Sequence, residues 1–196
     1  MTNKKKLRVS KRDIIELSMI LFLFLVVYLT GSQAEVFGRV QELILKTGIM
    51  NASVSEDETK EANLDFILKD IEGNQLNVNT LEGKTMFINI WATWCTPCVA
   101  EMPSINKLYN KLNSERIVFL MISEDNSLEK AYKWAKKKGF DFDVYTAPNL
   151  PNEYRTGYVP STFVINPKGE LVLTKTGIAN YDTRKFEKFL LELSQL

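Results

Sequence analysis

Two cysteines, Cys95 and Cys98, are the only thiols in a chain of 196 residues. They lie in the segment Trp94-Cys95-Thr96-Pro97-Cys98. If Cys95 occupies the first turn of a helix, Cys98 comes onto the same face, and the two sulfur atoms can form a reversible disulfide. A chain that keeps one such pair and no other thiol is expected to use that pair for redox chemistry.

The segments on either side of the pair predict how the thiols are presented. Residues 84–92 form an apolar run rich in β-branched and aromatic side chains, which is typical of a strand buried on both faces. Residues 99–112 carry apolar side chains at three- and four-residue intervals, which predicts a helix. The thiol of Cys95 would then face the positive end of the helix dipole, which favours thiolate over thiol. That thiolate would attack a disulfide, and Cys98 would resolve the mixed disulfide.

Other uses of a paired cysteine fit these residues poorly. Zinc requires four ligands, and the chain contains no histidine and no third cysteine, so a metal site would need carboxylates or a second chain. Covalent haem attachment requires a histidine after the second cysteine, where Val99 stands. A purely structural disulfide would close too short a loop to constrain the unfolded chain much. We therefore predict no metal and no other cofactor.

Four segments, taken together, resemble a known family. Residues 91–98 read Trp-Ala-Thr-Trp-Cys-Thr-Pro-Cys and are followed by Glu-Met-Pro at 101–103. Residues 64–74, 80–84 and 159–169 supply further matches, the last beginning Val-Pro-Ser-Thr. In this order they resemble the TlpA-like (ResA-like) thiol-disulfide oxidoreductases, over about residues 62–196. The resemblance implies an α/β, thioredoxin-like fold with a central mixed β-sheet flanked by helices.

The resemblance also implies roles for individual residues. Cys95 would be the attacking thiol and Cys98 the resolving one. Pro160 would form a cis peptide bond with Val159 and face the disulfide, where these two residues and Trp94 would contact an extended protein substrate.

Glu101 has two readings. The resemblance implies that its carboxylate exchanges a proton with the resolving thiol, in place of the buried aspartate of thioredoxins, where this chain has Asn89. The alternative is a solvated acid that the helix dipole favours in the first turn.

The remaining pattern fits one domain. We expect strands at 117–123, 142–146, 162–166 and 170–176, and a loop or short helix at 149–157. A helix is expected at about 127–138, capped by Ser127 and ended by Gly139, and a final helix capped by Asp182. Trp134 and Tyr158 are assigned to packing.

The N-terminus predicts where the domain is located. Residues 1–13 form a basic tail, and residues 14–31 an apolar segment that is uncharged from Leu17 to Leu29. These features predict a cytoplasmic tail and a single transmembrane helix in a bacterial inner membrane, with the following domain outside the cytoplasm. Residues 32–61 would form a connector helix and a tether, and residues 62–196 the thioredoxin-like domain. A cleaved signal peptide ending near Ala34 is the alternative, and it would also export the domain.

Together these features predict a membrane-anchored disulfide reductase. The resemblance implies disulfide-containing substrates, such as envelope proteins or apocytochrome c, and a membrane thiol donor protein. A net charge of +1 gives no indication of nucleic-acid binding. One alternative is a thiol peroxidase, whose Pro-x-x-x-Thr/Ser-x-x-Cys motif is absent; another is a non-catalytic assembly module. The sequence leaves the substrate and the direction of electron flow open.

Overall fold

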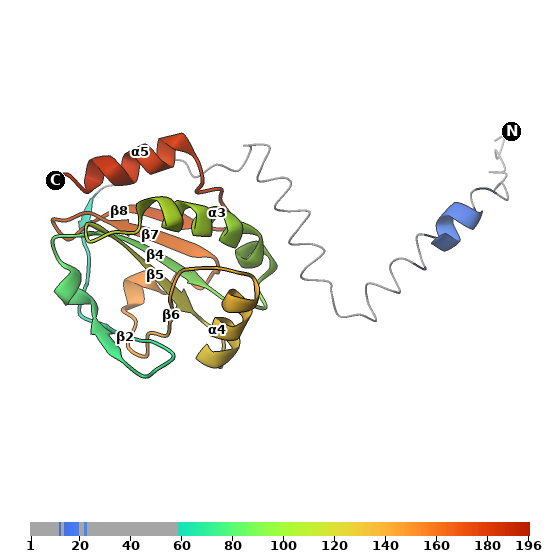
Figure 1. Ribbon diagram of the computed structural model, residues 1–196, viewed down its shortest axis with the longest axis horizontal. Helices are drawn as coiled ribbons and strands as arrows, with labels where there is room; N and C mark the ends of the chain where they lie inside the picture. The colour runs from blue at the N-terminus through green and yellow to red at the C-terminus, as the bar shows by residue number, and fades with distance from the viewer. Residues whose placement is uncertain (1–11, 13, 20–21, 23–58) are drawn as a thin grey trace, which may run out of the picture.

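The computed structural model describes residues 12, 14–19, 22 and 59–196 (Figure 1). The last range contains a six-stranded mixed sheet in the order β1-β8-β7-β4-β5-β6. Its strands are β1 (Lys60–Glu61), β4 (Thr85–Trp91), β5 (Ile117–Ser123), β6 (Val144–Tyr145), β7 (Ser161–Ile165) and β8 (Glu170–Thr176). The helices are α3 (Thr96–Leu112), α4 (Leu128–Lys137) and α5 (Arg184–Leu193), with short 3-10 helices η1 (Val78–Leu81) and η2 (Asn152–Tyr154).

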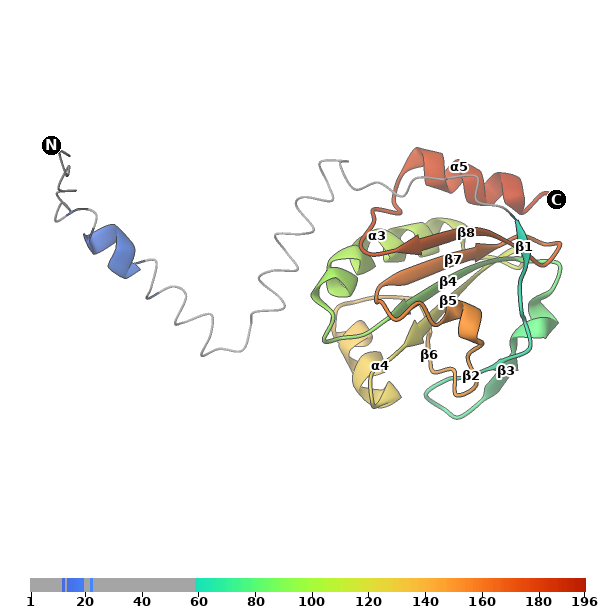
Figure 2. The ribbon, with the colours of Figure 1, turned by 180° about the vertical axis from the view of Figure 1, so that it is seen from behind.

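Strand β4 is an inner strand of the sheet, between β7 and β5, and all of its residues are buried. It pairs in parallel with β5 and antiparallel with β7, and its side chains alternate between two apolar clusters. Phe87 and Trp91 face the cluster that also contains side chains of α3, α4 and α5. Met86, Ile88 and Ile90 face the other cluster, under η1, η2 and the hairpin of β2 (Ile67–Lys69) and β3 (Gln75–Asn77). Figures 1 and 2 show α5 and this hairpin on opposite sides of the sheet.

Most of the predicted elements are confirmed. The strand at 117–123 has the predicted bounds, and Ser127 caps α4, which Gly139 follows with a positive φ of 75°. Trp134 packs against the ring of Trp91 at 5.4 Å between centroids, as assigned. The short helix expected in 149–157 is η2.

Four predictions about local structure are wrong. Helix α3 begins at Thr96 rather than at residue 99, because Cys95 itself is the N-cap. Strand β6 covers only Val144–Tyr145, and Thr146 forms an isolated bridge with Lys69. Helix α5 is capped by Thr183 instead of Asp182, whose carboxylate pairs with Lys111 at 2.8 Å. Tyr158 is 74% exposed rather than packed.

The N-terminal predictions fall mainly outside the described residues. This applies to the basic tail, the anchor at 14–31, of which only residues 14–19 and 22 are described, and nearly all of the connector. Where the structure does describe the chain, we find no helix with the length and apolar character needed to cross a membrane. Strand β1 pairs with β8, so the sheet begins at Lys60, inside the segment expected to be tether.

Candidate redox site

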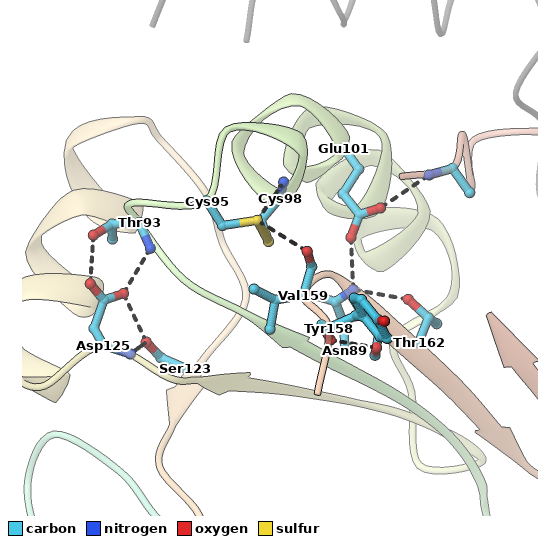
Figure 3. Close-up of a disulfide and its surroundings, with 12 residues drawn as sticks. Asn89, Thr93, Cys95, Cys98, Glu101, Ser123, Asp125, Tyr158, Val159 and Thr162 are labelled. Atoms are coloured by element: carbon cyan, nitrogen blue, oxygen red, sulfur yellow. Dashed lines mark hydrogen bonds between the residues drawn. A yellow bond between two sulfur atoms is a disulfide. The ribbon is translucent and has the colours of Figure 1, made fainter. Parts of the chain in front are cut away.

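The two cysteines form a disulfide at the N-terminus of α3 (Figure 3). Cys95 is the N-cap residue, with extended backbone angles, and its sulfur accepts a hydrogen bond from the Cys98 backbone N–H at 3.2 Å. Pro97 lies in the first turn, where a proline removes no intrahelical hydrogen bond. Both cysteines are buried, but Cys95 retains 5% exposure and Cys98 none, so Cys95 is the more accessible residue of the pair.

The loop before β7 faces the disulfide. The Val159–Pro160 peptide bond is cis, as predicted, and the carbonyl oxygen of Val159 lies 3.5 Å from the sulfur of Cys95. This contact joins residues that are 64 positions apart in the sequence. The structure therefore brings Val159 and Pro160 to the cysteine pair.

An open groove runs beside this loop. It has a volume of about 320 Å³ and is lined by Ile90, Trp94, Glu124 and the segment 154–159. The side chains of Trp94 and Tyr158, which line it, are 60% and 74% exposed. Exposed aromatic side chains around a depression are typical of surfaces that contact other proteins. Sequence reasoning identified Trp94 but missed Tyr158.

Glu101 is fully buried one turn after Cys98, so the prediction of a solvated acid is wrong. Its Oε1 accepts a hydrogen bond from Asn89 Nδ2 at 2.9 Å, and its Oε2 accepts one from the Ala179 backbone N–H at 3.2 Å. Asn89 Nδ2 also donates to Thr162 Oγ1, which in turn accepts from the Tyr181 hydroxyl at 2.7 Å. Figure 3 shows Asn89 between Glu101 and Thr162, with dashed lines for its two hydrogen bonds.

The burial of Glu101 changes its acidity. Removal from water raises the pKa of Glu101 to about 8, while the hydrogen bonds from Asn89 and Ala179 and the charge of Lys175 act in the opposite direction. A carboxyl group with a pKa near neutrality can both accept and release a proton under physiological conditions. The sequence placed Glu101 one turn after Cys98, but only the fold shows its burial.

A second carboxylate, Asp125, fixes the loop that leads to the cysteines. Its oxygens accept hydrogen bonds from the backbone N–H and the hydroxyl of Thr93, at 2.8 and 2.6 Å, and from the hydroxyl of Ser123 (Figure 3). The carboxylate side chain is 1% exposed, and Lys130 lies 3.4 Å away. The parallel pairing of β4 with β5 ends at Trp91 and Ser123. The hydrogen bonds between Asp125 and Thr93 therefore continue to hold the two chain segments together after the strands end. The sequence did offer one signal for Asp125, because polar residues directly follow the buried strand β5, and residues at such strand ends often form sites.

Replacement of Asp125 by alanine is expected to lower the free energy of unfolding by about 2–3 kcal/mol, because the buried donors of Thr93 would lose their acceptor. Asp125→Asn should retain most of the stability, since an amide oxygen can still accept from the Thr93 N–H. Urea unfolding of the full-length chain measures both. Glu124→Ala is the matched control at the exposed neighbouring position, and an equal loss in that variant would contradict the assigned role of Asp125.

No cluster of three or more histidine, cysteine, aspartate or glutamate side chains that could hold a metal ion occurs in the part of the chain described.

Comparison with known proteins identifies relatives over most of the described domain. A family model described as the AhpC/TSA family matches residues 59–174. The chain is 32% identical over 115 residues to the thiol-disulfide oxidoreductase ResA of Geobacillus kaustophilus, covering 58% of this chain and 66% of that protein. It is 32% identical over 114 residues to ResA of Bacillus subtilis, covering 57% and 64%. The chain thus spans about two thirds of the length of these curated relatives.

A solved structure agrees with this relationship at the level of the fold. A thiol:disulfide interchange protein of the thioredoxin family from Chlorobium tepidum superposes with a TM-score of 0.58 at 22% identity, covering 71% of this chain and 99% of that one. The thioredoxin-like α/β fold with a mixed sheet is thereby confirmed, as is the resemblance to ResA.

Proposed function

From the premise that this chain belongs to the AhpC/TSA family, we propose that it is a thiol-disulfide oxidoreductase acting by dithiol–disulfide exchange at Cys95 and Cys98. The observation that carries the proposal is the disulfide at the N-terminus of α3, in contact with the cis-proline loop. The relatives named as ResA thiol-disulfide oxidoreductases support it.

The exchange proceeds in two balanced steps from the reduced protein. The thiolate of Cys95 attacks one sulfur of a substrate disulfide, forms a mixed disulfide and releases the other substrate sulfur as a thiolate. Cys98 then loses its proton and attacks the sulfur of Cys95, which forms the observed disulfide and releases the second substrate sulfur. Two electrons pass to the substrate, and the protein is oxidised.

Neighbouring groups assist each step. The hydrogen bond from the Cys98 N–H stabilises charge on the sulfur of Cys95, as the dipole of α3 does. Glu101, one turn after Cys98, accepts the proton that Cys98 loses and returns it to solvent or to a leaving thiolate. An extended substrate segment lies in the groove against Trp94 and Val159, and next to Pro160 at the end of the groove wall.

We assign the direction of electron flow as reductive and the location as extracytoplasmic. The basic residues of 1–13 and the apolar run of 14–31 support a membrane anchor that leaves the domain outside the cytoplasm. Because that compartment favours disulfides, the pair needs a membrane thiol donor protein to stay reduced. Disulfide-containing envelope proteins, including apocytochrome c, are the proposed substrates.

The thiol peroxidase alternative lacks support in the residues around the pair. The motif would require proline seven residues and threonine or serine three residues before the cysteine, where Cys95 is preceded by Ile88 and Ala92. Rapid consumption of hydrogen peroxide by the reduced protein would reverse this preference. A non-catalytic assembly module would require that cellular function survive the loss of both cysteines.

The reduction potential of the Cys95–Cys98 couple tests the proposal. The full-length chain is equilibrated with defined thiol–disulfide buffers, and the fraction oxidised is measured by thiol alkylation. A potential below about −230 mV, near thioredoxin-type couples, is expected for a reductase. A potential above about −180 mV would assign oxidase or isomerase activity instead. The absence of a reversible couple would refute the redox function altogether.

A further inference from the structure

A lysine on strand β8, Lys175, lies beside the Glu101 network and has no part in the exchange steps above. Strands β7 and β8 pair with Thr162 directly opposite Lys175. Residues directly opposite each other in an antiparallel pair project to the same face, with Cβ atoms about 4.5–5.5 Å apart. Leu173, two residues earlier, is buried in the cluster that contains α3 and α5. Lys175 therefore projects to the face where Thr162 contacts Asn89.

The chain that follows Lys175 leads directly to Glu101. Strand β8 ends at Thr176, and Gly177 turns the chain with a φ of 78°, which favours glycine. Two residues later, the N–H of Ala179 donates to Glu101 Oε2. The half-buried Lys175 thus stands at the edge of the segment that covers the carboxyl group.

The other groups around Glu101 carry no positive charge. Strand β4 contributes the amide of Asn89, β7 contributes Thr162, and α3 contributes Cys98 one turn earlier. The segment after β8 contributes the Ala179 N–H and the phenol of Tyr181. Lys175 is the cation whose charge opposes the rise in the pKa of Glu101, and none of the ion pairs within 4 Å among the described residues includes Lys175.

Building on the exchange mechanism proposed above, we propose that Lys175 is a positioning residue for the resolving step, because its ammonium group is the counter-charge of Glu101. The ammonium favours the carboxylate form of Glu101 and so keeps an acceptor available for the proton of Cys98. Without it, the ionised fraction of Glu101, which is already the minor form at pH 7, becomes smaller still, and the resolving step slows because fewer molecules hold an acceptor for the proton.

The charge contact is tested by titrating Glu101 directly. The full-length chain is labelled with ¹³C at the glutamate carboxyl carbon, and the Glu101 resonance is assigned by its absence in Glu101→Gln. In Lys175→Met the titration midpoint should move to higher pH by at least about 0.5, a threefold rise in proton affinity. Lys175→Gln gives a second neutral side chain, and Lys175→Arg should restore the wild-type midpoint because it restores the charge.

Lys168→Met is the matched control, since Lys168 is exposed in the turn of the same hairpin, at the far end of β8. An unchanged midpoint in both neutral Lys175 variants, or an equal shift in Lys168→Met, would overturn the proposal.

A kinetic measurement tests the consequence for the reaction. Release of the second substrate thiol in a single turnover should be several-fold slower in Lys175→Met at pH 7, and should recover as the pH is raised. A slowed step that is independent of pH would contradict a role through Glu101. Failure of exchange in the wild-type chain would refute the proposed function, whereas the titration would still decide whether Lys175 acts on Glu101.

Discussion

Cys98→Ser is expected to stop turnover and to leave Cys95 joined to its substrate in a persistent mixed disulfide. A serine hydroxyl is not ionised at neutral pH and cannot attack the sulfur of Cys95, so the second step fails while the first proceeds. Turnover of a protein disulfide such as that of insulin should fall by at least about 10³-fold, the scale for loss of a nucleophile. Non-reducing electrophoresis and mass spectrometry would detect the adduct.

Cys95→Ser is the matched control, because it removes the more accessible cysteine and keeps the fully buried one. It should be equally inactive but form no adduct. Both variants should unfold at nearly the same urea concentration as the reduced wild type, because none of the three contains the Cys95–Cys98 disulfide and the exchange of one sulfur for oxygen is a small change. An adduct in Cys95→Ser but not in Cys98→Ser would reverse the roles of the two cysteines.

The central part of the fold could be predicted because its signals are local. Strands β4 and β5 are continuous apolar runs, and α4 has a capping serine, an apolar face and a terminal glycine. The cysteine pair and the segment Val159–Pro160 were identified because their residue types are distinctive at short spacing. None of these required knowledge of which residues meet across the chain.

The errors arise where tertiary contacts decide between similar local choices. Asp182 and Thr183 are adjacent, and both are good N-cap residues. Asp182 is drawn into ion pairs with Lys107 and Lys111 of α3, which leaves Thr183 to cap α5. The edge strand β6 is short because its pairing with β5 extends over only two residues. The apolar pattern of its sequence is weaker than that of β4 or β5, so the pattern did not predict where the pairing ends.

The parts of the site that the sequence did not show depend on long-range contacts. Glu101 is buried only because the segment around Ala179, 78 positions away, folds over it. Asp125 acquires its role from the contact with Thr93, 32 positions earlier. The residues next to Glu101 and Asp125 in the sequence are the same as those expected around a solvated acid. A single sequence therefore cannot tell a buried carboxylate from a solvated one at these positions.

Glu101→Gln is expected to remove a large pH dependence of stability. The pKa of Glu101 in the folded protein is about 8, whereas a glutamate side chain in water, as in the unfolded protein, has a pKa of 4.5. Between these values the folded state binds more protons than the unfolded state, so the free energy of unfolding falls as the pH rises. The stabilising contribution of the protonated group is complete below about pH 4.5 and is lost as the pH passes 8.

The magnitude follows from the separation of the two values. One pH unit is worth about 1.4 kcal/mol, so the contribution of this one group changes by at most about 5 kcal/mol. Glutamine carries no charge at any pH, and its amide can still accept a hydrogen bond from Asn89 or Ala179. The wild type should therefore be as stable as Glu101→Gln near pH 5, or more so, and several kcal/mol less stable near pH 9.

Urea unfolding of the reduced full-length chain at pH 5 and pH 9 measures this difference, because other titrating groups cancel between wild type and variant. Glu82→Gln, at an exposed position, should change stability by less than about 0.5 kcal/mol at both pH values. A difference for Glu101→Gln that does not vary with pH would mean that Asn89, Ala179 and Lys175 fully offset the burial of the carboxylate. In that case Glu101 would be ionised throughout the physiological range and could not donate a proton to a leaving thiolate. A pH-dependent difference would instead show that the folded protein is less stable at neutral pH than it would be with an uncharged side chain, because it keeps a titrating carboxyl group buried one turn after Cys98.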